Sequence, residues 1–446
     1  MLSVEENELI CRVGPGTPMG DLMRQYWLPA LRSDELPAPD CPPVRVRLLG
    51  ENLIAFRATS GRVGLVRNAC PHRGASFFFG RNEEEGLRCV YHGWKFDVDG
   101  RCVDMPSEPA ESNFKSKVRT TAYPCVERNG TVWTYMGPRT SAEVPSLPAI
   151  EANLMTDGHS SVLTVVRDCN WLQAIEGDID TSHAGFLHWG SLPVKEAERS
   201  PRPDMRYLLR TPLKYSVRDA VFGTSYAAPR EAEPDSYYWR MASFLFPFYS
   251  MAPQNPLRGV VTHCRAWVPI DDEHSMFWTW NWHAGEARGF PAAPAAASGA
   301  PGMAMLPNTA DWMGRFRLVA NRENDYLIDR AVQRFEKSGR GFTGIEGVHL
   351  QDQMITEAMG PIYDRSREHL GTTDAMIIRT RRRIAETVKA YSDHGALPAN
   401  VDNPDLYRVR AGWVVLPRDA DFWDATERLR GSVLEQEVEA APPPLT

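Results

Sequence analysis

The sequence lacks the features that mark several special classes of protein. It has no run of about 18 apolar residues, the length that crosses a bilayer, and stretches such as Val162 to Val166 have only the length of a strand. Its 50 Lys and Arg are outnumbered by 57 Asp and Glu, and the longest basic block is Arg381 to Arg383. We therefore expect neither a membrane protein nor a nucleic-acid-binding protein.

Cysteine is also scarce, with eight residues in 446. Such a density is too low for a disulfide framework. The N-terminus, MLSVEENE, is acidic where an export signal would be basic and then apolar, so we expect a cytoplasmic protein. In a reducing compartment, paired cysteines more often bind metal than form disulfides. No Gly-x-Gly-x-x-Gly lies in a strand-to-helix context, so no dinucleotide site is predicted.

The length predicts two or three folding units, at about 150 residues each. From about Pro42 to Gly137 the chain is dense in short β-type runs separated by turns, which predicts a small β-sandwich or barrel. The predicted strands are Val44–Gly50, Leu53–Arg57, Gly64–Val66, Trp94–Asp97 and Thr131–Tyr135. A short helix, Met19–Tyr26, and a linker, Pro37–Pro43, precede them.

The second half mixes strand and helix patterns, which predicts an α+β fold. The predicted strands are Ser160–Arg167, Tyr237–Phe246 and Met276–His283, the last with Trp278, Trp280 and Trp282 on one face, and the predicted helical regions are Asn170–Leu187, Thr309–Lys337 and Met376–His394. Gly285–Asn308 is rich in Ala, Pro and Gly and predicts a long flexible loop, and Ala440–Thr446 a frayed tail.

A first set of metal-binding residues comprises Cys70, His72, Cys89 and His92. Each pair lies in a glycine-containing loop between strand-like runs and supplies one thiol and one imidazole. Zinc is an alternative metal for this site, because two Cys and two His also suit tetrahedral Zn²⁺. Zinc fingers, however, usually keep Cys with Cys and His with His along the chain. The alternation fits a [2Fe-2S] cluster in which one iron takes both thiolates and the other both imidazoles.

A second set lies in the segment from Asn170 to His188. On an unbroken helix, His183 and His188 would point about 140° apart, so they need a break to share a metal, and we expect Gly185 to supply it. Asp180, three residues before His183, is expected on the same helical face within hydrogen-bonding reach. Two histidines with a carboxylate are the facial donor set of mononuclear non-haem Fe(II) oxygenases, although a His-x₄-His pair alone also suits structural roles.

Together these motifs resemble the Rieske non-haem iron oxygenases, the aromatic ring-hydroxylating dioxygenase α-subunits. Residues 12–20 (RVGPGTPMG), 90–97 (VYHGWKFD) and 359–366 (MGPIYDRS) resemble the phthalate-dioxygenase-like branch. The resemblance implies His183 and His188 as iron ligands, and Asp180 as a bridge toward a Rieske histidine of the neighbouring subunit. The third ligand in the family is a distant Asp. The candidates are Asp325, Asp329, Asp352, Glu357 and Asp364, of which Asp352 matches the family's segment best, with His349 as a packed or supporting residue.

The resemblance also implies the architecture. Residues 1–41 would form a helical segment and linker, 42–145 an all-β Rieske [2Fe-2S] domain, and 146–446 an α+β catalytic domain of the helix-grip type, with an antiparallel sheet and helices. The expected cofactors are the Rieske cluster and a mononuclear Fe(II).

The implied activity is that of a terminal oxygenase that dihydroxylates an aromatic carboxylate with O₂. O-demethylation of a methoxylated aromatic acid is a second reading, and a Rieske electron carrier without catalysis is a third. Electrons would come from a separate NAD(P)H-dependent flavin and iron-sulfur reductase, and the implied assembly is a homotrimer or a pair of trimers.

The substrate carboxylate suggests an arginine clamp. The strand from Tyr237 to Tyr249 supplies aromatic residues and one cation, Arg240, with Arg210 nearby in sequence. The phthalate enzymes of the family use arginines from this half, so Arg240 or Arg210 is the expected clamp. Ordinary ion pairing of either arginine is the alternative.

Overall fold

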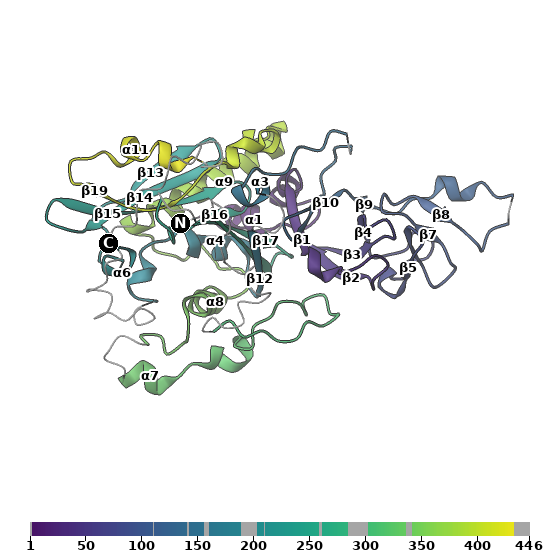
Figure 1. Ribbon diagram of the computed structural model, residues 1–446, viewed down its shortest axis with the longest axis horizontal. Helices are drawn as coiled ribbons and strands as arrows, with labels where there is room; N and C mark the ends of the chain where they lie inside the picture. Colours follow the sequence, from purple (N-terminus) through teal and green to yellow (C-terminus); the bar gives the residue numbers. More distant parts are fainter. Residues whose placement is uncertain are drawn as a thin grey trace.

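A computed structural model describes residues 2–109, 111–140, 142–155, 160–188, 203–208, 210–257, 261–283, 302–335 and 341–431. These residues form three small antiparallel sheets and one large one (Figure 1). Residues 284–301 and 432–446, which contain most of the expected Ala/Pro-rich loop and the expected tail, lie outside the described part of the chain.

The small sheets belong to the N-terminal third. One sheet orders its strands β1 (Trp27–Arg32), β11 (Thr131–Tyr135) and β10 (Cys125–Arg128). The second contains β2 (Val44–Leu48), β3 (Glu51–Arg57), β4 (Val63–Arg67) and β9 (Ala122–Tyr123), and the third β5 (Arg81–Glu83), β6 (Gly86–Arg88), β7 (Lys95–Phe96) and β8 (Cys102–Asp104). This region is all-β, as its short alternating runs and frequent turns predict.

The large sheet has eight strands and forms the centre of the rest of the molecule. Seven strands follow the order β12, β18, β17, β16, β15, β14 and β13, and β19 pairs with β15. Their bounds are β12 Ser160–Arg167, β13 Ser216–Ala220, β14 Gly223–Glu231, β15 Ser236–Leu245, β16 Tyr249–Met251, β17 Val261–Pro269, β18 Ser275–His283 and β19 Gly412–Pro417. All these pairings are antiparallel, so this half is α+β with an antiparallel sheet, as expected.

Helices pack around this sheet. The α-helices are α1 Val4–Cys11, α2 Pro18–Met23, α3 Glu151–Leu154, α4 Trp171–Ile179, α6 Pro203–Arg206, α7 Arg330–Phe335, α8 Val348–Ala358, α9 Ala375–His394, α10 Ala399–Asp402 and α11 Phe422–Ala425. Short 3-10 helices cover Ser33–Glu35, Phe77–Phe79, Phe114–Lys117, His183–Gly185, Arg322–Leu327, Thr372–Asp374, Pro404–Tyr407 and Arg428–Arg430. In the described part of the chain, no helix is both long and apolar enough to cross a membrane.

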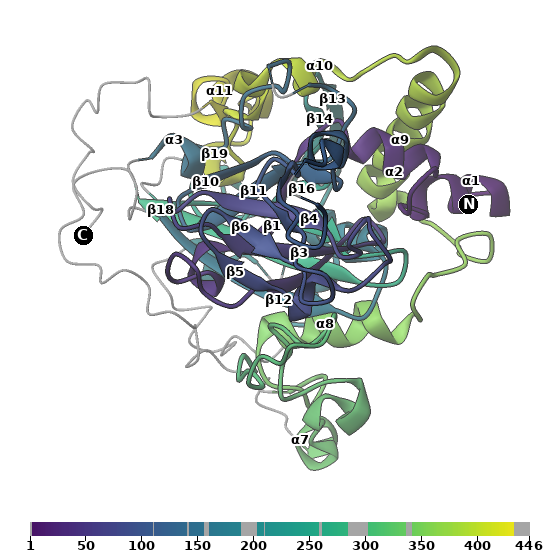
Figure 2. The same ribbon diagram turned by 90° about the vertical axis from the view of Figure 1, so that its right-hand side faces the viewer.

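The longest helix, α9, shows why such segments become helical. Its buried positions include Met376, Thr380, Ile384 and Val388, a four-residue spacing that keeps one stripe toward β13 and β14. It ends at Gly395, whose left-handed backbone (φ 67°) is a common helix terminator. Figure 2 shows α9 beside α1 and α2, with α8 lower in the view, and both α8 and α9 contact α4.

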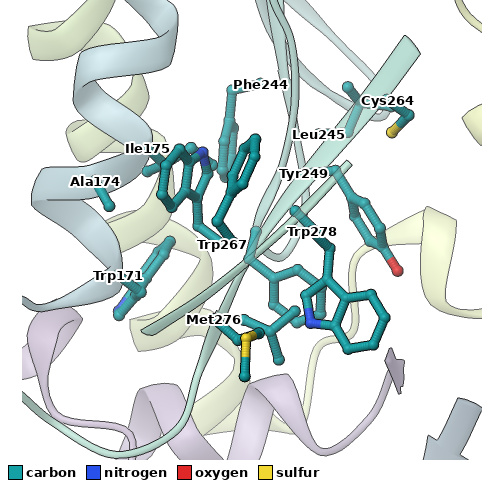
Figure 3. Packing of buried hydrophobic residues seen from close by; sticks show 14 of the residues in the cluster. Trp171, Ala174, Ile175, Phe244, Leu245, Tyr249, Cys264, Trp267, Met276 and Trp278 are labelled. Atoms are coloured by element: carbon teal, nitrogen blue, oxygen red, sulfur yellow. The ribbon is translucent and has the colours of Figure 1, made fainter. Parts of the chain in front are cut away.

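The core of the catalytic half lies between α4 and the large sheet. Figure 3 shows Trp171, Ala174 and Ile175 of α4 together with Phe244 and Trp267 of the strands. All five side chains are at most 3 % exposed. Burial of large aromatic side chains stabilises the fold, and here it also fixes α4, which leads directly into the predicted ligand segment.

The expected tryptophan face of β18 joins the two halves of the protein. Trp280 stacks on Trp133 of β11 with ring centroids 5.4 Å apart, and its Nε1 donates to Thr131 Oγ1 at 2.9 Å. Trp278 stacks on Trp280 at 5.8 Å, and all three tryptophans of this face are buried. The strand face predicted from the alternation of aromatic and polar residues therefore forms an interface between the large sheet and the first small one.

The predicted helical region Thr309–Lys337 is largely wrong. Only α7 is α-helical there, in the residues described up to 335, and an isolated bridge pairs Met305 with Leu318. Polar side chains bond the local backbone instead: Asn308 Oδ1 accepts from Phe316 N, and Asn321 Oδ1 from Glu323 N. Such side-chain bonds compete with helical ones, which explains why the apolar spacing did not produce a helix.

Removal of the Trp280 side chain should weaken the junction between the two halves. We expect Trp280→Ala to lower the free energy of unfolding by about 3–5 kcal/mol, because a buried indole, its stacking and its hydrogen bond are lost together. Leu213→Ala, at a side chain that is 53 % exposed, is the control and should change it by less than about 0.5 kcal/mol. Urea unfolding followed by tryptophan fluorescence and circular dichroism measures both variants. A midpoint of Trp280→Ala equal to that of the unmodified protein would contradict the role given to this junction.

Candidate metal centres and active site

Two loops of matching geometry present the first set of predicted ligands. The backbone N–H of Cys70 donates to the carbonyl five residues on at 2.8 Å, and Gly74 N–H donates back to Cys70 O at 2.9 Å. The second loop repeats both bonds from Cys89 and Gly93, at 2.8 and 3.0 Å. Each glycine has φ +77°, a backbone conformation that is unfavourable for residues with a side chain. The sequence repeats the Cys-to-Gly spacing because both loops need the same turn.

The structure brings the four predicted ligands together. The Cys70 and Cys89 side chains interact and are 2 % and 3 % exposed, while the rings of His72 and His92 lie 4.4 Å apart and half-buried. Burial raises the pKa of Cys70 to about 11, so a bound cation is what would hold this pair as thiolates. Two inner thiols and two outer imidazoles are the donor set of a Rieske cluster, and the residues present fit it.

Aromatic contacts hold the two imidazoles in place. His72 stacks on Trp94 with ring centroids 4.3 Å apart, and the ring centroids of Tyr91 and His92 lie 3.9 Å apart. Trp94 is itself fixed by a hydrogen bond from Nε1 to Ser107 Oγ at 3.0 Å. Tyr91 is 55 % exposed, so the imidazole end of the site is close to the protein surface.

The chain turns between α4 and the second set of predicted ligands in a way that differs from the expectation. Helix α4 already ends at Ile179, and Asp180 has extended backbone (φ −83°, ψ 136°), so Asp180 and His183 do not share a helical face. Asp180 instead accepts from the backbone N–H groups of Ser182 and His183 at 2.6 and 3.2 Å. This side-chain turn ends the helical path before His183 and places Asp180 Oδ2 3.2 Å from His183 Nδ1. Between the two histidines, the short 3-10 helix His183–Gly185 ends at Gly185, where the break was expected.

Asp352 of α8 completes a group of three donors. His183 Nε2 lies 3.2 Å from His188 Nε2, and Asp352 Oδ1 lies 3.2 Å from His188 Nε2 and 3.7 Å from His183 Nε2. Donors that share an ion at about 2 Å lie roughly 3 Å apart in neighbouring coordination positions, so the spacing fits one metal ion. Although burial acts to raise it, the hydrogen bond with His188 and the charges of His188, His183 and Arg167 lower the pKa of Asp352 to about 2, so the carboxylate is ionised.

The other candidate carboxylates have different surroundings. Glu357 is buried on α8 and accepts from Tyr326 OH at 2.6 Å and Gln353 Nε2 at 2.8 Å. Asp364 bonds Ser366, and Asp329 accepts from the first turn of α7. His349 is a packed, half-buried residue whose ring centroid lies 5.1 Å from that of Phe277. In the part of the chain that the structure describes, Asp352 alone joins the two histidines in a group of three donors.

Each histidine of this group is oriented through its other ring nitrogen. His183 Nδ1 faces Asp180, and His188 Nδ1 lies 2.9 Å from Gln351 Oε1. The Gln351 amide is fixed in this direction because its Nε2 donates to Ile345 O at 2.8 Å and Thr343 Oγ1 at 3.2 Å. His188 must therefore carry its proton on Nδ1, which leaves the Nε2 lone pair toward the metal position.

Sequence reasoning missed Gln351. Its chemistry depends on a histidine 163 residues away, and neither its residue type nor its spacing distinguishes it from the polar residues around it on α8. Its place directly before Asp352 is the one available signal, and it is weak because consecutive helical residues face directions about 100° apart.

A cavity of about 610 Å³ adjoins the group of three donors. Its lining includes Asp180, His183 and Asp352, so the metal position faces the cavity. Apolar side chains form much of the wall: Phe186, Leu187, Trp267, Phe277, Phe342, Val348, Ile355, Met359 and Leu370. The volume and apolar character suit a small aromatic molecule beside the metal position.

The two arginines expected to clamp a substrate have different surroundings. Arg210 is exposed and donates to the carbonyls of Glu231 and Ala232 at 2.8 and 3.1 Å. Arg240 is half-buried on β15 and acts electrostatically on His183. Neither is among the described residues that line the cavity, which instead include Arg167, Arg265 and Arg381. A clamp at Arg240 or Arg210 stays a prediction.

The fold and the two donor groups define a two-centre iron protein, and comparisons with known proteins define it further. Residues 26–124 match the Rieske [2Fe-2S] domain family, and residues 134–439 match the LigXa C-terminal domain like family. The chain belongs to the Rieske non-haem iron oxygenases, which use a [2Fe-2S] cluster and a mononuclear iron as cofactors. This membership identifies the first centre as [2Fe-2S] rather than zinc, and makes the protein an oxidoreductase rather than only an electron carrier.

Similar proteins include three curated oxygenase subunits. The 3-chlorobenzoate-3,4-dioxygenase oxygenase subunit of Comamonas testosteroni is 46% identical over 97% of this chain and 100% of its own length. The phthalate 4,5-dioxygenase oxygenase subunit of Pseudomonas putida is 35% identical over 99% of each chain. The 5,5'-dehydrodivanillate O-demethylase oxygenase subunit of Sphingobium sp. is 36% identical over 63% of each.

Solved structures share the fold. In the reduced complex between oxygenase and ferredoxin in carbazole 1,9a-dioxygenase, the matched chain has a TM-score of 0.53 and 18% identity, covering 86% of this chain and 95% of that one. At this identity the likeness concerns the fold alone. An N-terminal all-β Rieske domain followed by a larger α+β domain with an antiparallel sheet is therefore confirmed.

Loss of the Gln351 acceptor should weaken metal binding at the second centre. We expect Gln351→Met to lower the affinity for Fe(II) by about 10- to 100-fold, because His188 loses the partner that holds its ring and tautomer. Titration of the protein with Fe(II) against a chelator measures the affinity, with the Rieske visible spectrum as a check on the other centre.

Gln353→Met is the matched control on the same helix. Gln353 is also buried, but its Nε2 bonds Glu357 rather than a histidine. The control should bind Fe(II) like the unmodified protein, and equal losses in both variants would show that Gln351 acts only through stability.

Proposed function

We propose that this protein is the terminal oxygenase component of a Rieske system that dihydroxylates an aromatic carboxylate. The observation that carries the proposal is the group of His183, His188 and Asp352 at the wall of an apolar cavity of about 610 Å³. A metal with free coordination positions beside a small apolar cavity is suited to bring O₂ and an aromatic ring together.

In this proposal, Cys70, His72, Cys89 and His92 hold the Rieske cluster, and His183, His188 and Asp352 hold the mononuclear iron. When bound, the cluster supplies single electrons and the iron activates O₂ for insertion into the substrate. Asp180 and Gln351 keep both imidazoles in the tautomer that offers Nε2 to the metal. The aromatic wall around Trp267 and Phe277 excludes water and orients the ring.

Two observations support a carboxylate-bearing substrate. The two relatives that match nearly the whole chain are named for 3-chlorobenzoate and phthalate, both aromatic carboxylates. The cavity is lined by arginines as well as aromatic residues, and guanidinium groups are suited to carboxylates.

O-demethylation is the second candidate activity. It is favoured by the relative named as an O-demethylase, which is 36% identical over 63% of this chain. The same donors and cavity serve either reaction, because the outcome depends on which substrate atom lies nearest the metal. Dihydroxylation is preferred because the relatives matched along nearly the whole chain are named dioxygenases.

We also propose that electrons arrive from a separate protein and pass between copies of this chain. The fold matches an oxygenase described in complex with ferredoxin, which supports a ferredoxin or an NAD(P)H-dependent reductase as donor. The strands β5 to β8, which flank the cluster loops, and helices α4 and α8 lie toward opposite ends of the long axis (Figure 1). This separation favours transfer to a neighbouring copy, as in a homotrimer or a pair of trimers, with Asp180 at the receiving side.

A product screen tests the activity. Holoenzyme with an NADH-linked reductase, ferredoxin and O₂ should convert 3-chlorobenzoate or phthalate to a dihydrodiol, seen by mass spectrometry as a gain of two oxygen atoms from ¹⁸O₂. Methoxybenzoates tested in parallel report demethylation through formaldehyde. Formaldehyde without dihydrodiols would replace the first activity by the second, and turnover of neutral aromatics only would refute the acid substrate.

Asp180→Asn should separate metal binding from electron delivery. We expect about three irons per chain to remain, because Asn keeps an oxygen acceptor for His183 Nδ1, while turnover falls by about 100-fold or more since the negative charge beside His183 is lost. Iron analysis, the Rieske spectrum and single-turnover reoxidation of the cluster measure this. Asp219→Asn, at an exposed ion pair with Arg379, should leave all three unchanged. Undiminished turnover in Asp180→Asn would remove Asp180 from the electron path.

A further inference from the structure

Arg167, the last residue of β12, lies between the large sheet and α8 and contributes to the cavity wall. Its side chain is 1 % exposed. The guanidinium lies over the ring of Trp267, with its central carbon 5.1 Å from the ring centroid. A cation this deeply buried normally has an anionic partner, since an unpaired buried charge is costly.

The hydrogen bonds of Arg167 use only part of its capacity. Nη1 donates to Thr356 Oγ1 at 3.1 Å and Nη2 to His349 O at 3.4 Å, whereas Nε has no acceptor among the described residues. A guanidinium carries five N–H donors, so three are left without an acceptor in the described part of the chain.

The three arginines of the cavity wall differ in whether a carboxylate is bonded to them. Arg265 is bonded to Asp178. Arg381 is bonded to Glu176 at 2.5 Å and to Glu368. For Arg167, no carboxylate of the described residues lies within 4.0 Å.

The acid that acts most strongly on Arg167 from a distance is Glu357. Its oxygens are already occupied, because they accept from Asp168 N at 2.9 Å, from Gln353 Nε2 and from Tyr326 OH. Among the arginines of the described residues that line the cavity, Arg167 is therefore the one without an acid partner.

Arg167 and the metal donor Asp352 lie along the same face of α8, which would orient an anion bound at Arg167 relative to the metal position. His349, Asp352 and Thr356 are spaced by three and four residues, so they follow one face of α8. Arg167 bonds the first and the last of them, and Asp352, between the two, faces the metal position. The cation and the metal donors thus border one stretch of cavity, whose wall there includes Trp267 and Phe277.

We propose that Arg167 binds the carboxylate of the aromatic substrate, with the ring lying against Trp267 and Phe277 and its far carbons turned toward the metal. The inference rests on the proposed function, and it assigns the clamp to Arg167 in place of Arg240 or Arg210. A carboxylate held bidentately at a buried guanidinium is bound strongly and in one orientation, so Arg167 decides both affinity and the position of attack.

The test compares an acid with its neutral isostere. Equilibrium dialysis of anaerobic holoenzyme with 3-chlorobenzoate and with 3-chlorobenzamide measures both dissociation constants. The unmodified protein should prefer the acid. Arg167→Met should lose at least about 10-fold in affinity for the acid, because a charge-assisted pair is removed, and less than about 2-fold for the amide. Retained binding of the amide shows that the cavity of the variant is folded.

Arg240→Met and Arg210→Met are the matched controls, and each should keep the preference for the acid. A preference that survives Arg167→Met, or that disappears in Arg240→Met instead, overturns the assignment and leaves the proposed function intact. No preference in the unmodified protein would refute the acid substrate itself, and the assignment with it. Should Arg167→Met not fold, Arg167→Lys decides: a loss confined to the acid supports the proposal, and equal changes for both probes overturn it.

Discussion

The docking of α8 onto α4 is the constraint on which the catalytic half depends. Gln173, buried on α4, donates from Nε2 to the carbonyls of Thr356 and Gly360 at 2.9 and 2.7 Å, and accepts from Tyr363 N at 3.0 Å. Three bonds from one buried amide hold the end of α8 and the chain beyond it, because any displacement would leave polar groups without partners. Asp352 is thereby brought against His188, 164 residues earlier, at 3.2 Å.

Charge around the cavity is arranged by the same packing. Glu176 of α4 is bonded to Arg365 and Arg381, and Asp178 to Arg265, so acids of α4 tie it to the chain after α8, to α9 and to β17. Buried ion pairs contribute little net stability, because desolvation offsets their attraction, but a wrong arrangement would strand a charge. These pairs therefore fix the positions of α4, α9 and β17 around the cavity more than they add to stability.

Much of the fold followed from periodicity. The strands Ser160–Arg167 and Met276–His283 and the helix at Met376–His394 were predicted within one residue, because each has a continuous buried face. The prediction failed between Thr309 and Lys337, where Asn308 and Asn321 bond the local backbone. The contact between Asp180 and His183 was predicted correctly for the wrong reason, since a side-chain turn and not a helical face produces it.

The sequence by itself determined the kinds of donor and their local grouping: Cys70 with His72, Cys89 with His92, and His183 with His188 and Asp180. These groups are readable because their members lie within a few residues and the backbone between them sets their spacing. Only the tertiary structure decided that Gln351 orients His188 and that Arg167, not Arg240 or Arg210, lines the cavity. Those relations join residues far apart in the chain, and burial and helix docking, which leave no local spacing pattern, select the partners.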